Sequence, residues 1–363
     1  MEDKTPKKKI KIALIGCGRI AERHLDAIKF HKESLDLVAI CDLDNNRLNY
    51  VDAFVSDNIS KKHNLRKYNL FADLILEITN KKLEIDLIML LTPSGMHPKQ
   101  TCEAANLGIN ICTEKPMATN WEDGTEMVKI CKEKKVKLYV VKQNRFNKTL
   151  QLLKSQIDSG RFGRLSLVTL NVFWQRPQEY YDQSEWRGTK KLDGGALMNQ
   201  ASHYVDLLDW LIGPVYQLNA YTATLGRDIE VEDTAVLNLK WCNGALGTMA
   251  VTMLTYPKNL EGSITILGEN GTAKIGGKAV NEIEIWDFKE KSELDEEISD
   301  VSYHTTSVYG FGHRPYYESM IKDLKGQETD VCKGEDGLKS LEILVAAYKS
   351  AKENRYVELP LNR

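Results

Sequence analysis

The sequence contains no long hydrophobic run, which argues against a membrane-spanning protein. No apolar stretch approaches the ~20 residues that a helix needs to cross a bilayer. The polar start, MEDKTPKKK, lacks the apolar core of a signal peptide. We therefore expect a cytoplasmic protein that does not bind a membrane. A formal net charge of −2 also gives no electrostatic reason to expect nucleic acid as a partner.

Cysteine is present, but in no functional pattern. The seven cysteines are scattered, odd in number and without a C-x-x-C pair, and several lie in apolar runs. Such cysteines are usually buried, reduced thiols, which fits a cytosolic protein. No set of His, Cys and carboxylate residues has the sequence spacing of metal ligands, so we predict no metal. With 363 residues, 42% apolar and 28% charged, the chain is long enough for two globular domains.

The most informative stretch is a glycine turn between an apolar run and a helical pattern. The run 12–15 ends in Gly16, and Gly18, Arg19 and Ile20 lead into a helical pattern at Ala21. This order of strand, turn and helix is the context in which G-x-G-x-x-G/A predicts dinucleotide binding. Gly16 allows the tight turn, Gly18 lets the backbone approach a pyrophosphate, and the helix N-terminus attracts phosphate. We expect Gly16, Gly18, Arg19 and Ile20 to bind the cofactor.

Asp42 indicates which dinucleotide is bound. It follows a second apolar run, 37–41, at the point where a carboxylate binds both ribose hydroxyls of NAD. The same carboxylate would repel the additional phosphate of NADP. We therefore predict NAD as the cofactor.

Residues 1–142 alternate short apolar runs with helical patterns, which predicts βαβ units and a doubly wound parallel sheet. The expected strands are 12–15, 37–41, 85–91, 109–113 and 136–141, and the expected helices are 20–30, 47–55, 72–78, 98–107 and 121–134. Ligands bind at the carboxyl ends of such strands. Two loops at these ends should face the nicotinamide half of the cofactor. One contains Thr92, Pro93 and His97, and the other contains Glu114 and Lys115.

In residues 143–363, consecutive strand patterns separated by short turns predict a second domain of the α+β class, with a large, mostly antiparallel open sheet. The expected strands are 164–175, 216–224, 234–241, 245–255, 261–267, 272–276 and 282–286, and the expected helices are 150–157, 195–211, 315–325 and 337–354. We interpret the acidic stretch 289–300 as a surface loop.

The helix expected at 195–211 carries the catalytic candidates of the second domain. Asn199 and His203 are four residues apart and would share one helical face, with Asp206 three residues further along. A histidine on a half-apolar helix is more often structural than catalytic. The glycine pair before the helix and the neighbouring Asn199 favour a functional role for His203. Arg187 lies shortly before this helix, in a loop that could supply a cation to an anionic substrate.

The chain resembles the Gfo/Idh/MocA family, named after glucose–fructose oxidoreductase and inositol dehydrogenase. The motifs that carry the resemblance are the glycine turn 16–21, Thr92-Pro93 with His97, Glu114-Lys115-Pro116, and the stretch 193–197 leading through Asn199 to His203. The resemblance covers nearly the whole chain. It implies a Rossmann domain followed by a mixed α/β domain whose open sheet often forms oligomer interfaces, and hence a homo-oligomer, either a dimer or a tetramer. It also implies NAD(P)-dependent oxidation of a sugar or polyol hydroxyl, or the reverse reaction.

Three further stretches, 195–204, 256–262 and 305–313, resemble a bacterial subgroup of this family. Its members oxidise the 3-hydroxyl of a UDP-linked N-acetylated uronic acid, UDP-N-acetylglucosaminuronic acid, on the way to surface polysaccharide such as lipopolysaccharide. The resemblance implies that Lys115, Asn199 and His203 are catalytic and bind this sugar. Many family members have an aspartate in place of Asn199, whose amide cannot accept a proton but can hydrogen-bond a sugar hydroxyl.

Such a substrate is an anion, and we expect Arg145, Arg187 and Lys258 to bind it. One of Lys115 and His203 would remove the hydroxyl proton while the other stabilises the developing negative charge. Histidine titrates near neutrality, which favours His203 as the base.

Two other functions stay open. One is that of another NAD(P)-dependent sugar or polyol dehydrogenase, or of a 3-ketosugar reductase. The other is that of a non-catalytic NAD-binding regulator, against which the presence of both Lys115 and His203 argues.

Overall fold

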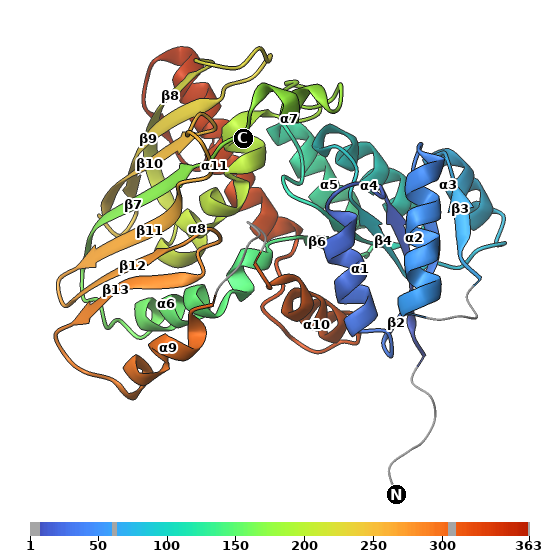
Figure 1. Ribbon diagram of the computed structural model, residues 1–363, viewed down its shortest axis with the longest axis horizontal. Coiled ribbons are helices and arrows are strands. Elements are labelled where there is room, and N and C mark those ends of the chain that lie inside the picture. Colours follow the sequence, from blue (N-terminus) through green and yellow to red (C-terminus); the bar gives the residue numbers. More distant parts are fainter. Residues whose placement is uncertain (1–7, 60–63, 304–309, 362–363) are drawn as a thin grey trace, which may run out of the picture. The chain divides into compact units, whose positions relative to one another are not determined.

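The computed structural model describes residues 8–59, 64–303 and 310–361, which form two compact units (Figure 1). The first unit comprises Met1–Ala118, Glu122–Val141 and His313–Asp336, and the second comprises Thr119–Trp121, Lys142–Gly312 and Gly337–Arg363. We expected a division into 1–142 and 143–363, so the main difference is the segment His313–Asp336, which belongs to the first unit. No helix in the described part of the chain is long and apolar enough to cross a membrane.

The first unit is built on a parallel sheet of six strands in the order β3-β2-β1-β4-β5-β6. The strands are β1 (Ile10–Ile15), β2 (Leu35–Cys41), β3 (Arg66–Tyr68), β4 (Leu87–Leu90), β5 (Asn110–Thr113) and β6 (Leu138–Val140). The helices are α1 (Ala21–Phe30), α2 (Asn45–Asn58), α3 (Phe71–Thr79), α4 (His97–Asn106), α5 (Trp121–Glu133) and α10 (His313–Leu324), and η1 (Ser94–Met96) is a 3₁₀ turn. This strand order confirms the predicted doubly wound sheet, and its central strands are buried because helices cover both faces.

Helix α10 packs on α1, which explains why its segment joins the first unit. Arg314 forms a two-pronged ion pair with Asp26, with both distances 2.8 Å. The Tyr317 hydroxyl lies 2.7 Å from His24 Nδ1. The short edge strand β3 was not predicted, because three residues rich in charge give no apolar signal.

The second unit contains an eight-stranded sheet in the order β13-β12-β11-β7-β10-β9-β8-β14. The strands are β7 (Leu165–Phe173), β8 (Val215–Ala223), β9 (Thr234–Trp241), β10 (Leu246–Thr252), β11 (Glu261–Gly268), β12 (Gly271–Gly276), β13 (Glu282–Phe288) and β14 (Val357–Glu358). The pair β7–β10 is parallel and the other neighbours are antiparallel. This confirms the mostly antiparallel sheet.

Helices of the second unit cover one face of this sheet and leave the other face open (Figure 1). The long helices are α6 (Lys148–Asp158), α8 (Ser202–Ile212) and α11 (Gly334–Glu353), and the short ones are α7 (Gln178–Asp182) and α9 (Ile298–Val301). Helical turns are η2 (Gln143–Phe146), η3 (Ala196–Gln200) and η4 (Glu293–Glu297). Strand residues alternate accordingly: in β9, Ala235, Leu237 and Leu239 are buried, while Val236 and Asn238 are exposed.

Two expectations for the second unit were wrong. The stretch 289–300 is not simply a loop, since it contains η4 and the start of α9. Ser292 and Asp295 form a capping box there, and Arg161 pairs with Asp295 at 2.6 Å. The helix expected at 195–211 is also interrupted: η3 has π-helical geometry and ends at Gln200, and α8 begins at Ser202.

Candidate cofactor and catalytic residues

The glycine turn after β1 has the geometry that a dinucleotide requires. Gly16 has a positive φ of +94°, and a Cβ added there would lie 2.7 Å from the backbone oxygen of Leu91. Only glycine fits this position. At Gly18 the nearest described atom to an added Cβ is Arg47 Nη1, at 3.8 Å, so the backbone is accessible to a phosphate. Arg19 is exposed and Ile20 is the N-cap of α1, which places both at the helix N-terminus.

Asp42 lies beside this turn, at the carboxyl end of β2. Its Oδ2 accepts a hydrogen bond from the backbone N–H of Cys17 at 2.7 Å, and its Oδ1 accepts one from Asp44 at 2.9 Å. Arg47 Nη1 lies 3.8 Å from Oδ2. A carboxylate fixed next to the glycine turn fits the recognition of ribose hydroxyls. The residues of the first unit therefore fit a bound NAD.

The loop after β4 is held by His97. This side chain is fully buried, with Nε2 2.8 Å from the Thr92 oxygen and Nδ1 3.1 Å from the Pro116 oxygen. Burial lowers the pKa of His97. The imidazole thus ties the Thr92-Pro93 loop to the turn that follows Glu114 and Lys115. Its contact with the cofactor stays a prediction, as do those of Thr92 and Pro93.

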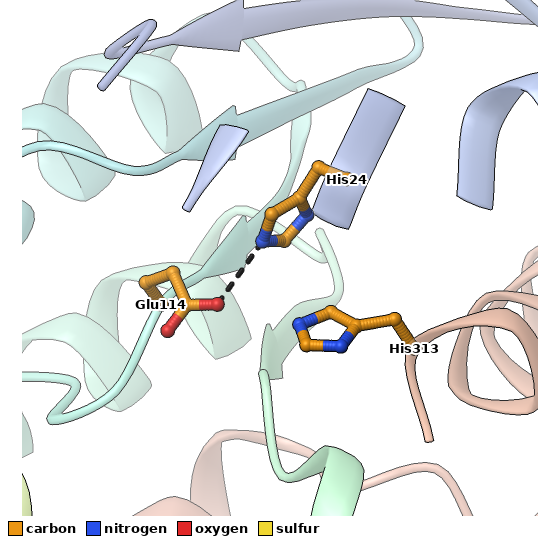
Figure 2. Close-up of side chains that lie close together, drawn as sticks. All are labelled: His24, Glu114 and His313. Carbon is orange, nitrogen blue, oxygen red and sulfur yellow. Dashed lines mark hydrogen bonds and ion pairs between the residues drawn. The ribbon is translucent and has the colours of Figure 1, made fainter. Parts of the chain in front are cut away.

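Glu114 lies in a buried cluster with His24 of α1 and His313 of α10 (Figure 2). Its Oε1 lies 3.0 Å from His24 Nε2, and its Oε2 accepts the backbone N–H of Lys115 at 3.1 Å. His24 Nδ1 is in turn 2.7 Å from the Tyr317 hydroxyl. A chain of hydrogen bonds therefore runs from α10 through α1 to the backbone of Lys115.

The charge on Glu114 is stabilised by this cluster. Burial would raise the pKa of Glu114, but the hydrogen bond and charge of His24, with Lys115 and His313, lower it to about 2. For His313, burial and the charge of His24 lower the pKa to about 3, so this imidazole is neutral. Lys115 therefore follows a carboxylate that stays ionised at neutral pH.

The same three side chains are the one group of metal-ligand type among the described residues. Their donor atoms lie within 4.8 Å of one another. The His24–Glu114 contact is already satisfied by a proton, so these two groups need no ion between them. The absence of a metal stays a prediction.

His203 is the second catalytic candidate and lies near the start of α8. It is mostly buried, and its Nε2 is 2.9 Å from Gln143 Nε2. Gln143, 60 residues earlier in the sequence, therefore helps to hold this imidazole. Gln143 was not predicted, although it follows the apolar run 136–141 as Glu114 follows the run 109–113, which was an available signal.

Asp206 and Arg145 form a buried pair close to His203. Arg145 donates to both carboxylate oxygens, at 2.7 and 2.8 Å, and Lys142 Nζ lies 3.6 Å away. Burial would raise the pKa of Asp206, but these two cations lower it. Because Asp206 balances the charge of Arg145, an attraction of Arg145 for an anionic substrate stays a prediction.

Asn199 lies in η3 and not in the helix of His203. The expectation of one continuous helix through both residues was therefore wrong, and that their side chains share a face stays a prediction. The Asn199 amide donates to Asp193 Oδ1, and Asp193 Oδ2 accepts the backbone N–H of Gly188 at 2.7 Å. Asn199 is thus tied to the loop before the glycine pair.

The remaining predicted cations lie in loops of the second unit. Arg187 is half-buried, donates to the Tyr180 oxygen at 2.7 Å and lies over the Tyr180 ring. Lys258 is exposed, between the exposed side chains of Tyr256 and Leu260. Of the motif 305–313, residues 305–309 lie outside the described residues.

Comparison with known proteins supports this description of the chain. Residues 10–142 match an oxidoreductase family's NAD-binding Rossmann fold, and residues 154–359 match the C-terminal alpha/beta domain of the same family. Among curated proteins, myo-inositol 2-dehydrogenase of Thermotoga maritima is 23% identical over 360 residues, covering 96% of this chain and 98% of the relative.

Two solved structures are similar over the whole chain. The WlbA dehydrogenase from Bordetella pertussis, in complex with NADH and UDP-GlcNAcA, is 51% identical with a TM-score of 0.92, covering 99% of this chain and all of the other. The WlbA dehydrogenase from Chromobacterium violaceum, with the same two ligands, is 52% identical with a TM-score of 0.90 and complete coverage of both chains. The predicted family and the predicted NAD cofactor are confirmed. The chain belongs to the Gfo/Idh/MocA oxidoreductase family.

Proposed function

We propose that this protein oxidises the 3-hydroxyl of UDP-N-acetylglucosaminuronic acid to the 3-keto sugar, with NAD as the oxidant. The observation that carries the proposal is the similarity of just over 50% identity to two dehydrogenases solved with NADH and UDP-GlcNAcA. Lys115, Asn199 and His203, the residues that this chemistry needs, are all present and held by hydrogen bonds described above.

His203 is the proposed base and Lys115 the proposed electrostatic partner. The Gln143 amide nitrogen lies 2.9 Å from His203 Nε2, and because an amide nitrogen only donates, we take Nε2 as the acceptor. We assign the sugar hydroxyl to the place that the Gln143 amide occupies, so that the single lone pair of Nε2 takes the hydroxyl proton. The ammonium of Lys115 stabilises the alkoxide that develops. When bound, NAD supplies the hydride acceptor.

The rest of the proposed site holds the anionic part of the substrate. Arg187 and Lys258 lie in loops, where cations can reach a diphosphate or a carboxylate. Asn199 offers an amide to a sugar hydroxyl, and Arg145 lies on the turn next to Gln143.

The direct test is mass spectrometry of the products after incubation with UDP-N-acetylglucosaminuronic acid and NAD. A panel of free sugars, inositol and other nucleotide sugars, followed by NADH formation, distinguishes other sugar dehydrogenases. NAD binding without turnover of any sugar would indicate a regulator instead.

Variants test the residue assignment. We expect His203→Ala and Lys115→Ala each to lower kcat by about 10²–10⁴-fold. His203→Ala should leave NAD affinity nearly unchanged, and Lys99→Ala, which removes an exposed lysine in α4, is the control. Wild-type turnover by both variants would refute the assignment.

We further propose a homo-oligomer in the cytoplasm that contributes to surface polysaccharide such as lipopolysaccharide. The open face of the large sheet supports the oligomer, because adjacent strands expose Leu167, Leu246, Val236 and Tyr221 there. Cysteines that are all free within the described residues suit a reducing compartment.

A further inference from the structure

The turn η3, which carries Asn199, lacks a cap of its own. The residue before it is Gly195, whose φ is +98° and which has no side chain to accept the first N–H groups. Three successive N–H groups are satisfied from outside the turn. Ala196 donates to the Glu232 backbone oxygen at 3.1 Å, Leu197 to Glu232 Oε1 at 2.8 Å and Met198 to the Tyr348 hydroxyl at 3.1 Å.

Gly195 is required by this arrangement. A Cβ added at Gly195 would overlap the carboxylate of Glu232. The second residue of the glycine pair in this loop therefore makes room for a buried carboxyl group. Glu232 comes just before β9, and Tyr348 is on α11, so both supports are remote from the turn in sequence.

The hydrogen bonds around Tyr348 need one more proton than the phenol supplies. The Tyr348 oxygen lies 2.7 Å from the Gly194 carbonyl oxygen and 2.8 Å from Glu232 Oε1. Both contacts are short enough to require a proton, but a phenol has only one to donate. If Glu232 is protonated, its O–H donates to Tyr348 and the Tyr348 O–H donates to Gly194. If Glu232 is ionised, the phenol proton can go to only one of these oxygens, and the other contact becomes repulsive.

We propose that protonated Glu232 is a positioning residue, which holds the turn bearing Asn199 through a Glu232–Tyr348–Gly194 hydrogen-bond chain. The role in catalysis rests on the proposed function, because Asn199 and the adjacent helix of His203 are assigned there. Loss of the proton breaks the chain at Gly194 and loosens the turn.

The surroundings of Glu232 favour the protonated form. Burial raises the pKa of Glu232 to about 7, and the nearby carboxylate of Asp193 adds to the shift. The Leu197 N–H and the Tyr348 hydroxyl lower the pKa but do not offset burial. Asp233, the next residue, points its carboxylate elsewhere, accepting the N–H groups of Leu225, Gly226 and Arg227.

Hydrogen exchange of a peptide covering 194–201 tests the positioning role without substrate. At pH 6 we expect exchange roughly 10- to 100-fold faster in Glu232→Ala and in Tyr348→Phe than in the wild type. Glu230→Gln is the matched control, because it removes an exposed carboxylate two residues away that contacts Lys190 and not the turn. Wild-type protection in both variants would overturn the proposal.

The proton itself is tested by Glu232→Gln, which cannot ionise. The infrared carbonyl band of a protonated carboxyl group should be present in the wild type at pH 6, weaken by pH 8, and be missing from Glu232→Gln. After correction for the intrinsic rate, wild-type exchange at 194–201 should rise from pH 6 to pH 8, and Glu232→Gln should show no such rise. If the wild type lacks this band, or if its exchange at 194–201 does not change with pH, Glu232 is not protonated as proposed.

Measuring kcat tests whether the turn η3 contributes to catalysis. Glu232→Ala should lower kcat for UDP-N-acetylglucosaminuronic acid about tenfold or more, with KM for NAD unchanged, since the proposed NAD contacts lie in the first unit. Unchanged kcat in a variant with a loosened turn would overturn the catalytic part. If the wild type does not oxidise this sugar, the proposed function fails, while the exchange and infrared results still decide the role of Glu232.

Discussion

The His24 imidazole and the Glu114 carboxylate, 90 residues apart in sequence, share a buried hydrogen bond of 3.0 Å. The other carboxylate oxygen accepts the backbone N–H of Lys115. The position of the proposed catalytic lysine therefore depends on a charged group that is itself held by α1 and α10.

Replacing Glu114 by glutamine should weaken this support. The amide oxygen can still accept the Lys115 N–H, but the substitution removes the negative charge that pairs with His24 and Lys115. We expect a loss of about 1–3 kcal/mol in the free energy of unfolding, together with a lower kcat. Denaturant unfolding and steady-state kinetics measure these effects. Glu84→Gln, which removes an exposed partner of Lys11, should change neither, and an unaltered Glu114→Gln variant would contradict the role given to this carboxylate.

Asp42 should determine the preference for NAD over NADP. Asp42→Asn keeps an acceptor for the Cys17 N–H but removes the charge that repels a ribose phosphate, and Arg47 is close enough to attract one. We expect the ratio of kcat/KM for NAD to that for NADP to fall about 10- to 100-fold, equivalent to roughly 1.4–2.8 kcal/mol. Asp44→Asn is the control, because asparagine also caps α2. A ratio as high as that of the wild type would show that Asp42 does not select the cofactor.

The sequence predicted the elements correctly wherever neighbouring residues alone determine the structure. The runs that became β1, β2 and β4 are apolar on both sides, and Gly16 is fixed by the turn that follows β1 directly. The interruption of the helix expected at 195–211 could not be predicted, because Glu232 and Tyr348 cap η3 from distant segments. In the same way, the sequence offered many cations for Asp206, and only the fold selects Arg145 and Lys142.

The hydrogen bond between Asn199 and Asp193 can be tested by exchanging the amide and the carboxylate between the two positions. Asn199→Asp introduces the aspartate found in many family members, but places it against the carboxylate of Asp193. Two adjacent carboxylates raise the pKa of one of them, so kcat at pH 8 should fall roughly tenfold or more and recover toward lower pH. The pH dependence of kcat measures this effect.

The reversed pair, Asp193→Asn with Asn199→Asp, is the matched control. It restores one amide and one carboxylate, and the amide introduced by Asp193→Asn can still accept the Gly188 N–H through its carbonyl oxygen. We expect most of the activity at pH 8 to return. Equal activity of the single and double variants would show that this pair does not act as a unit.

Glu232 should make the protein less stable as the pH rises from about 4 to 7. An unfolded chain ionises a glutamate near pH 4.3, whereas burial raises the pKa of Glu232 in the folded protein to about 7. Between these values the folded state binds more protons, so the free energy of unfolding falls with pH and then levels off. The contribution of this one group is roughly 4 kcal/mol. Urea unfolding across this pH range gives the free energy of unfolding of the wild type and of Glu232→Gln. The difference between the two curves of free energy against pH is the contribution of Glu232. Curves that run parallel would exclude a raised pKa.

The open sheet face should be where two copies of the chain associate. Leu246 is opposite Leu167, and Val236 is opposite Tyr221, so each of four adjacent strands exposes an apolar side chain on this face. Burying such a surface contributes about 25 cal/mol per Å², and a charge placed in it would lose its hydration. We therefore expect Leu246→Asp to shift the mass measured by light scattering from oligomer to monomer. Leu76→Asp, at an exposed leucine of α3 in the first unit, should leave the mass unchanged. If the wild type is already a monomer at micromolar concentration, or if both variants keep its mass, this face is not the interface.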